Sequence, residues 1–205
     1  MKQVMNRTGK SLLFKTFVLC LALSTGSTIV QGQRYQDLIT RTPVKENDVL
    51  IIGFMGGREA WDNDKRGVRK LALKLRAINL PSVHVETVEN KKRSLAIKLI
   101  RNAFDRDRSG RLDEHERISA RVILYGQSFG GAAVVKLARQ LKNLDMPVVM
   151  TIQVDSVGRS DKTIPSNVAR AANLFQRNGL IIKGEREIRS EDPKDDHHRQ
   201  FQIRL

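Results

Sequence analysis

The sequence predicts an α/β fold, an αβα sandwich around a mostly parallel sheet, and three observations support it. Apolar, strand-like runs alternate with amphipathic helical segments at least three times along the chain. A glycine-flanked serine at 126–130 joins one such run directly to a helical segment. The chain has 205 residues, 40% hydrophobic and 29% charged, which suits one globular domain with a proper core.

The first elements follow in order from these patterns. Residues 33–48 are expected to be a loose lead-in. The run DVLIIGF at 48–54 is continuously apolar and is typical of a buried strand. A helix is expected over 62–78, where apolar residues recur at helical spacing, and Pro81 stops it. Residues 82–88 alternate in the manner of a strand.

The second half continues the alternation. KKRSLAIKLIRNAF at 91–104 is a second amphipathic helix, and an acidic loop follows it. RVILYG at 121–126 is an apolar strand that leads into a helix over 130–143. PVVMTIQVD at 147–155 is another apolar strand. The remaining chain is expected to hold a short helix at 167–177 and a final short strand at 179–184.

A sheet of this kind collects its functional residues at the carboxyl ends of its strands. Gly53, Ser128 and Asp155 all fall at such ends. Functional residues are therefore expected at these three positions and in the acidic loop.

The N-terminal segment 1–32 has the pattern of a secretory signal peptide. It begins with basic residues, contains no acidic residue, has an apolar centre, and ends in Val30-Gln31-Gly32, which resembles a cleavage site. The alternative is an uncleaved membrane anchor, although the apolar run is shorter than the ~20 residues that a span needs. We expect a secreted or periplasmic protein whose domain occupies 33–205.

Cysteine content and charge narrow the possible partners. Cys20 is the only cysteine, so a mature chain has no disulfide and no cysteine-ligated zinc. Removing 1–32 takes away four cations and no anion, which reduces the net charge from +15 to +11. This charge indicates a soluble basic surface or weak contact with an anionic surface. Aromatic residues make up only 5%, with no stacking platform, so no nucleic-acid partner is expected.

Ser128 lies in Gly126-Gln127-Ser128-Phe129-Gly130, immediately after an apolar strand and before a helix rich in small residues. This context is typical of a nucleophile elbow, in which the serine sits on a sharp strand-to-helix turn. The alternative is a glycine turn with an idle serine. A serine hydroxyl reacts only when a base takes its proton and donors stabilise the oxyanion.

The oxyanion donors are expected on two backbone segments. Phe129 follows the serine, so its N–H at the helix N-terminus is one candidate. The glycine-rich sequence IIGFMGG at 51–57 follows the first strand, and there the N–H of Phe54 or Met55 is the second. The alternative for this segment is a plain glycine turn.

The remaining triad members are expected later in the chain. Asp155 ends the 147–155 strand and is the expected acid, with Asp161 as the fallback and a strand-end cap as the alternative role. Hydrolases of this type run Ser, Asp, His in chain order, which leaves His198, or alternatively His197, as the base. Both lie in a charged tail that no apolar strand immediately precedes, so a tail without a catalytic role is the alternative.

The loop DRDRSGRLDEHE at 105–116 has the spacing of an EF-hand calcium loop. Gly110 stands at the sharp turn, and Leu112 fills the apolar position. The expected Ca²⁺ ligands are Asp105, Asp107, Ser109, the carbonyl of Arg111, Asp113 and Glu116. Affinity is expected to be weak, of order 10⁻⁴–10⁻³ M. The ion is expected to be structural; the alternative is an Asx-rich turn that binds nothing.

Together these segments resemble secreted bacterial α/β-hydrolases of the lipase and esterase type. The resemblance covers about 48–190 and rests on DVLIIGFMGGREAWD, GVRKLALKLR, VHVETVEN, the acidic loop, ARVILYGQSFGGAAVVKLAR and TIQVDSVG. It implies that Ser128 and Asp155 belong to a triad. Members typically continue into a segment that holds the histidine in an H-x-x-[IL]-[DE]-like setting. This chain has no such setting, so the resemblance implies a domain shortened at its C-terminus.

Two functions follow as hypotheses. The first is a calcium-binding serine hydrolase that cleaves a small ester or thioester through an acyl-enzyme on Ser128. The second is a non-catalytic calcium-binding envelope protein with an incomplete triad. A third, binding of a polyanion through the net charge of the mature chain, depends on charge alone.

Overall fold

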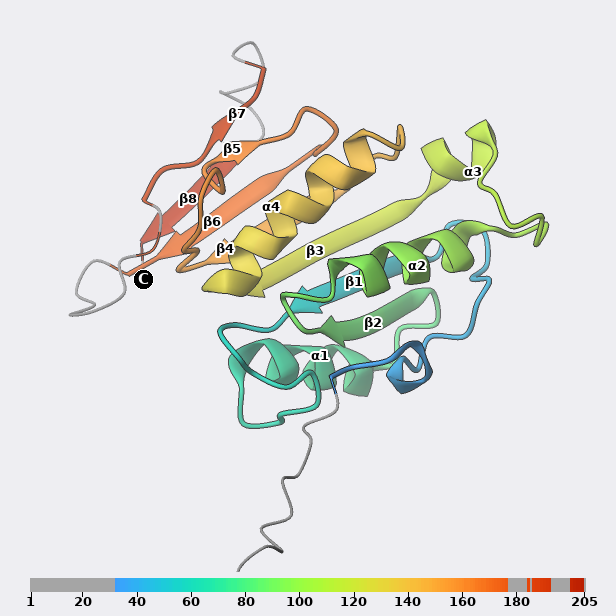
Figure 1. Ribbon diagram of the computed structural model, residues 1–205, viewed down its shortest axis with the longest axis horizontal. Coiled ribbons are helices and arrows are strands. Elements are labelled where there is room, and N and C mark those ends of the chain that lie inside the picture. The colour runs from blue at the N-terminus through green and yellow to red at the C-terminus, as the bar shows by residue number, and fades with distance from the viewer. Residues whose placement is uncertain (1–31, 177–183, 185, 193–199, 205) are drawn as a thin grey trace, which may run out of the picture. The chain divides into compact units, whose positions relative to one another are not determined.

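A computed structural model describes residues 32–176, 184, 186–192 and 200–204 (Figure 1). Its central feature is a six-stranded sheet in the order β2-β1-β3-β4-β6-β8, and every neighbouring pair is parallel. The strands are β1 Val49–Phe54, β2 Val83–Val88, β3 Arg121–Gln127, β4 Met150–Val154, β6 Ala171–Phe175 and β8 Gln200–Arg204. Two short strands, β5 Thr163–Ile164 and β7 Arg189–Ser190, pair separately.

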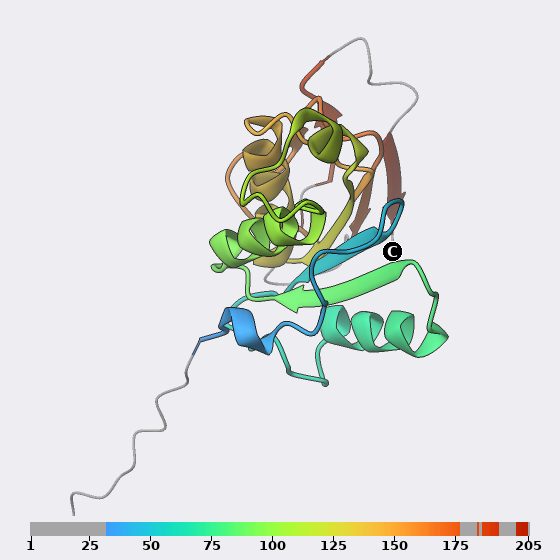
Figure 2. The same ribbon diagram turned by 90° about the vertical axis from the view of Figure 1, so that its right-hand side faces the viewer.

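Helices cover both faces of this sheet, which confirms the αβα sandwich (Figure 2). Helix α1 packs on one face, and helices α2 and α4 pack on the other. The helices are the 3₁₀ turn η1 Tyr35–Asp37, α1 Gly67–Ile78, α2 Arg93–Phe104, α3 Glu114–Ser119 and α4 Phe129–Lys142.

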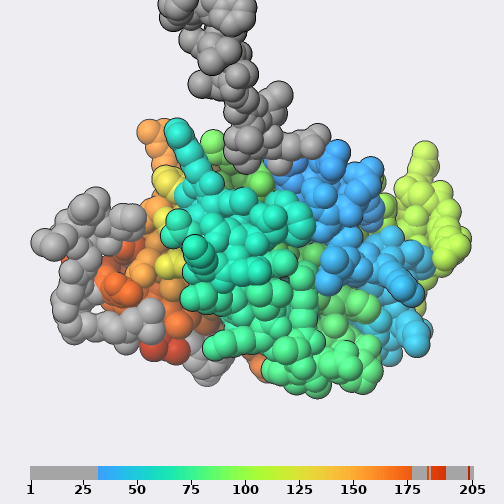
Figure 3. Space-filling view, turned by 90° about the horizontal axis from the view of Figure 1, so that it is seen from below, coloured from blue at the N-terminus to red at the C-terminus, as the bar shows by residue number. Residues whose placement is uncertain are grey.

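Alternation along the strands divides the core into two layers. Leu50, Ile52 and Phe54 of β1 are fully buried in the larger layer, together with apolar residues of α2 and α4. On the α1 side, Tyr125 packs with Val68 and Met55, and its hydroxyl donates to the Val68 carbonyl oxygen over 2.9 Å. Burial raises the pKa of Tyr125. Figure 3 looks onto the α1 side, where the surface is formed largely by the lead-in and by the β1–β2 segment.

Most predicted elements agree with the structure, but the helix expected at 167–177 is wrong. Residues 171–175 form strand β6, which pairs in parallel with β4 and β8. Ala171 and Ala172 favour a helix locally, yet pairing on both sides and burial decide their conformation. The final strand expected at 179–184 falls mostly on residues outside those described, and Gly184 is not in a strand.

The first helix also begins later than expected, at Gly67 rather than at residue 62. Residues 60–66 form turns, because the Asn63 side chain accepts the Lys65 N–H and the Asn63 carbonyl accepts the Arg66 N–H. Asn and Asp residues compete with the helix backbone in this way. The described chain contains no helix with the length and apolar character needed to cross a membrane. The segment expected to be a signal peptide, 1–32, lies outside the described residues except for Gly32.

Candidate active site and candidate metal loop

The order of the strands reverses beside β1. From β1 the chain passes to β2 on one side, whereas β3 and the later strands lie on the other. In open parallel sheets, ligands bind at the carboxyl ends of the strands at such a reversal. Ser128 follows β3, and the glycine-rich loop 55–57 follows β1, so both stand at this point.

Ser128 occupies an unusual backbone conformation, with φ 56° and ψ −123°. This conformation places it between β3 and α4, with its N–H donated to the Val154 carbonyl oxygen at 2.9 Å. The residue is half-buried, and within the described chain its hydroxyl makes no hydrogen bond. Non-glycine residues in sparsely populated conformations cluster at functional sites. The geometry is that of a sharp, strained strand-to-helix turn with a free hydroxyl.

The two glycines of the elbow are required by close packing. A Cβ on Gly126 would lie 2.5 Å from the carbonyl carbon and oxygen of Gly130. A Cβ on Gly130 would collide with the carbonyl oxygen of Phe54, in the neighbouring strand β1. The first turn of α4 therefore crosses directly over the ends of β3 and β1, and a side chain at either glycine would separate them.

The predicted oxyanion donors differ in availability. Phe129 is the first residue of α4, and the first N–H groups of a helix have no acceptor within it. The N–H of Met55 is donated to the Val88 carbonyl oxygen at 2.9 Å, so Met55 does not offer the free donor that the sequence suggested. Phe54 is fully buried as the last residue of β1, in register with Gly126.

Asn90 fixes the loop after β1 and was missed by the sequence analysis. Its side-chain amide donates to the carbonyl oxygens of Met55 at 3.0 Å and Gly57 at 2.6 Å. Gly57 adopts φ +48°, and Gly56 N–H donates to the Glu59 carboxylate at 3.1 Å. The only signal in the sequence was a polar residue just beyond the end of a strand at 82–88.

Asp155 lies at the carboxyl end of β4, one residue after the partner of the Ser128 N–H. Its carboxylate accepts the Gln176 N–H at 2.7 Å, and its backbone has φ 44°. Gly184 packs against it, because a Cβ there would lie 2.5 Å from the Asp155 Cα. The fallback acid, Asp161, is buried and accepts a hydrogen bond of 2.6 Å from the Ser156 hydroxyl.

The histidines that the structure describes lie away from Ser128. The ring Nε2 of His84, near the start of β2, lies in a 2.8 Å hydrogen bond with the carboxylate of Asp48, which immediately precedes β1. His115 is exposed on α3, before β3 begins. Both stand at the amino end of the sheet. His197 and His198 lie outside the described residues, and β8, which follows them in the chain, begins at Gln200 opposite Ala171.

The acidic loop 105–116 brings three carboxylates together. Oxygen atoms of Asp105, Asp107 and Glu116 lie within 4.8 Å of one another. Asp105 accepts the Gly110 N–H at 2.9 Å, and Gly110 has φ +81°, as a sharp turn at that position requires. The Ser109 N–H donates to Asp107 at 2.9 Å and holds the pKa of that carboxyl below its usual value.

The second half of the loop begins a helix. Asp113 accepts the Glu116 N–H at 2.7 Å, and Glu116 accepts the Asp113 N–H at 3.1 Å, which is a capping box for α3. Glu116 is 4% exposed and also accepts the Arg106 N–H at 2.7 Å. Asp113 lies outside the three-carboxylate group, and the Arg111 carbonyl accepts the Ser109 hydroxyl at 2.8 Å.

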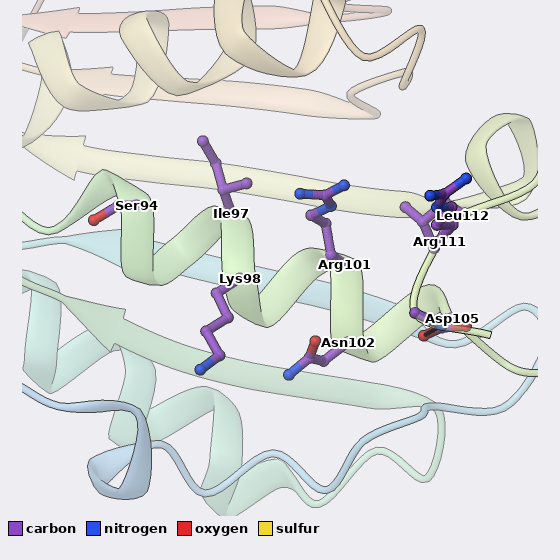
Figure 4. Close-up of a pocket in the computed structure, with 9 residues that line it drawn as sticks. Ser94, Ile97, Lys98, Arg101, Asn102, Asp105, Arg111 and Leu112 are labelled. Atoms are coloured by element: carbon purple, nitrogen blue, oxygen red, sulfur yellow. Dashed lines mark hydrogen bonds between the residues drawn. The ribbon is translucent and has the colours of Figure 1, made fainter. Parts of the chain in front are cut away.

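The loop is fastened to helix α2. Asp105 directly follows the last residue of α2, and Leu112 packs against the core. A cavity of about 290 Å³ lies beside the loop. Among its lining residues, Lys98 and Asn102 project from one side of α2 and Ile97 and Arg101 from the other (Figure 4). The cavity is lined mainly by cationic and polar side chains, so we do not assign the metal to it.

The loop and the elbow stand at opposite ends of β3 (Figure 1). The seven residues of β3 span about 23 Å at ~3.3 Å per residue. An ion held by the loop therefore has no access to a carbonyl bound at Ser128.

Comparison with models of known protein families found no match, and comparison with curated protein sequences found none either. Evidence on the function therefore comes from the residues of this chain and their geometry.

Proposed function

We propose that the protein is a serine hydrolase that cleaves an ester or thioester through an acyl-enzyme on Ser128. One observation carries the proposal: the strained conformation of Ser128, with its hydroxyl free, at the carboxyl edge where the strand order reverses. An idle serine in a plain turn gives no reason for that conformation or for the two glycines packed around it.

The reaction proceeds in two steps. Ser128 Oγ attacks the acyl carbon and passes its proton to the base, and the bond to the leaving oxygen or sulfur breaks as the base returns that proton. Water then attacks the acyl-enzyme, the base takes a proton from it, and Ser128 regains its hydroxyl. The Phe129 N–H, at the N-terminus of α4, stabilises the oxyanion in both steps.

Asp155 is the acid of this proposal, because it ends the strand beside β3 and Asp161 is engaged by Ser156. The base is His198 or His197, the two histidines that follow Asp155 in the chain. The only support for His198 and His197 is their position after Asp155 in the chain.

Calcium is proposed as a structural ion in the loop 105–116. The carboxylates of Asp105, Asp107 and Glu116 supply converging oxygens of the type that Ca²⁺ prefers. The ion would neutralise their mutual repulsion and connect the end of α2 to the start of α3. Weak affinity of this kind suits the secreted or periplasmic location that residues 1–32 predict.

One observation favours the second candidate, a calcium-binding envelope protein without catalysis. Both histidines in the described part of the chain stand at the sheet end opposite Ser128. Without a base, a serine hydrolase retains only the weak catalysis that its oxyanion hole and binding supply.

Hydrolysis of 4-nitrophenyl esters by the full chain tests the proposal, with Ser128→Ala, His198→Ala and His197→Ala measured beside it. Turnover that Ser128→Ala abolishes, and that one histidine variant lowers by about 10³-fold or more, supports the triad. Equal activity in wild type and Ser128→Ala contradicts it. Activity lost with Ser128 but retained in both histidine variants assigns the base elsewhere.

A further inference from the structure

A second cavity, of about 510 Å³, lies beside the elbow, where the N-termini of two helices converge. Asn90, Lys91 and Arg93 reach it from the start of α2, and Phe129 and Ala132 from the first turn of α4. Helix N-termini present free N–H groups and a positive partial charge. The first residue of each helix, Arg93 and Phe129, lines this cavity, and two helix N-termini at one cavity favour an anion there.

Four cationic side chains line the same cavity: Lys91, Arg93, Lys136 and Arg159. No carboxylate is among the described residues that line it. Arg66, Arg69, Arg76 and Lys142 elsewhere in the fold are paired with acids, but none of these four forms an ion pair in the part of the chain that the structure describes. The cavity therefore gathers four positive charges that no acid among the described residues neutralises; Lys91, Lys136 and Arg159 are exposed, and Arg93 is half-buried.

Arg93 is the clearest case of a cationic side chain that the surrounding residues do not satisfy. Its guanidinium Nε is buried and has no hydrogen-bond partner among the described residues. One terminal nitrogen reaches the Asn90 carbonyl oxygen only at 3.4 Å. A buried donor without an acceptor is costly, so the fold holds this guanidinium in place without satisfying it. The enclosed Nε is out of reach of a ligand, and a bound anion would accept from the terminal nitrogens instead.

The cavity also adjoins the nucleophile. Phe129 follows Ser128 in the chain and lines the cavity wall, and Val157, another lining residue, donates its N–H to the Ser128 carbonyl oxygen at 3.3 Å. Phe129 is 56% exposed and offers an apolar surface between the serine and the cations. Ser128 itself is not among the lining residues, so a ligand that joins the serine to the cations must extend past Phe129.

We infer that the substrate is an ester or thioester that carries a phosphate group, and that Arg93, Lys136, Lys91 and Arg159 bind this group. The inference rests on the proposed hydrolase function and specifies its substrate class. Several cations and two helix N-termini around one cavity match the multiple charge of a phosphate better than a single carboxylate.

Titration calorimetry with inorganic phosphate tests the anion site without requiring catalysis. The double variant Arg93→Gln/Lys136→Gln should bind phosphate at least about tenfold more weakly than wild type, since two charge-assisted contacts are lost. The control Lys74→Gln/Arg101→Gln removes the same charge from α1 and α2 outside this cavity and should bind within about twofold of wild type. Equal losses in both double variants overturn the site, and acetate binding as tightly as phosphate overturns the assignment to phosphate.

A matched pair of esters then tests the substrate class. Wild type should hydrolyse 1-butyrylglycerol 3-phosphate with a higher kcat/KM than 1-butyrylglycerol, by about tenfold or more, and Arg93→Gln/Lys136→Gln should abolish the preference. The inference is overturned if wild type prefers the neutral ester. It is also overturned if the double variant retains the preference for the phosphate ester. If neither ester is cleaved while phosphate binding still depends on Arg93 and Lys136, the hydrolase proposal and the inferred substrate class are wrong. The anion-binding site is then still supported.

Discussion

Glu116 and Ser128 flank strand β3 from opposite ends, with Glu116 in the helix before it and Ser128 in the turn after it. An ion on Glu116 can therefore influence Ser128 only through the stability of the strand and the helices packed on it. The proposed metal loop and the proposed nucleophile therefore lie at opposite ends of one strand, a separation that the sequence alone does not show.

Calcium is expected to stabilise the wild-type chain and not the variant Glu116→Gln. At ten times its dissociation constant, a ligand that binds only the native state adds about 1.4 kcal/mol. The measurement is the melting temperature with and without calcium, compared within each protein because loss of the capping box also lowers the baseline of the variant. Glu114→Gln, an exposed neighbour outside the carboxylate group, is the control and should keep the calcium shift. Equal calcium-induced shifts in the melting temperature of all three proteins would show that calcium does not act through the loop.

Gly130→Ala is expected to destabilise the fold by about 1–3 kcal/mol, because the new Cβ meets the Phe54 carbonyl oxygen and the crossing of α4 over β1 must shift. Gly67→Ala is the matched control. A Cβ at Gly67, the first residue of α1, meets only the Gln127 side chain at 3.5 Å and should be neutral or slightly stabilising. Urea unfolding of both variants measures the difference, and a similar midpoint for the two would contradict the close crossing.

Ser128→Gly is expected to be more stable than Ser128→Ala by about 1 kcal/mol, although both lack the hydroxyl. Alanine keeps the strain of φ 56° and ψ −123°, whereas glycine adopts such angles without a Cβ penalty. Thermal unfolding of the two variants at one pH gives the comparison. Alanine equal to or above glycine in stability would mean that the turn is not strained.

Asp48 gives the fold a predictable response to acid. Burial alone would raise its pKa, but hydrogen bonds from the His84 ring and the Lys45 N–H outweigh burial and hold the pKa below its usual value. A lowered folded-state pKa means that the contribution of this carboxylate is complete above about pH 4, the unfolded value, and is lost as the pH falls through the folded pKa.

Asp48→Asn should therefore cost about 1–2 kcal/mol at neutral pH, and the difference from wild type should shrink in acid. Urea midpoints at neutral pH and near pH 2.5 measure it, with the exposed Asp62→Asn as the control. A difference that stays constant over this range would show that the pair has no role in the acid response.

Apolar runs were sufficient to predict β1, β3 and β4, because each is buried and bounded by glycine or charge. The strand-to-helix turn at Ser128 was also predictable, since an apolar strand, a glycine-flanked serine and a small-residue helix follow one another directly in the chain. Strand β6 was not, because its Ala-Ala-Asn sequence has no strand preference of its own and depends on pairing with β4 and β8.

The site was predictable only where it is local in sequence. Hydrogen bonding of the Met55 N–H to Val88 depends on the register between β1 and β2, which no motif reports. The cationic cavity combines residues from 90–93, 129–136 and 157–159, and only the packing of α2 against α4 brings them together. Such features follow from tertiary contacts and have no signature in any one segment.

The most direct test is covalent labelling of the full chain with a fluorophosphonate, followed by intact-mass measurement and peptide mapping, beside Ser128→Ala. If Ser128 is an activated nucleophile, wild type gains one adduct, the adduct maps to Ser128, and Ser128→Ala gains none. An unlabelled wild type, or an adduct on another serine that persists in Ser128→Ala, would contradict the hydrolase proposal and leave the acidic loop 105–116 as the better guide to function.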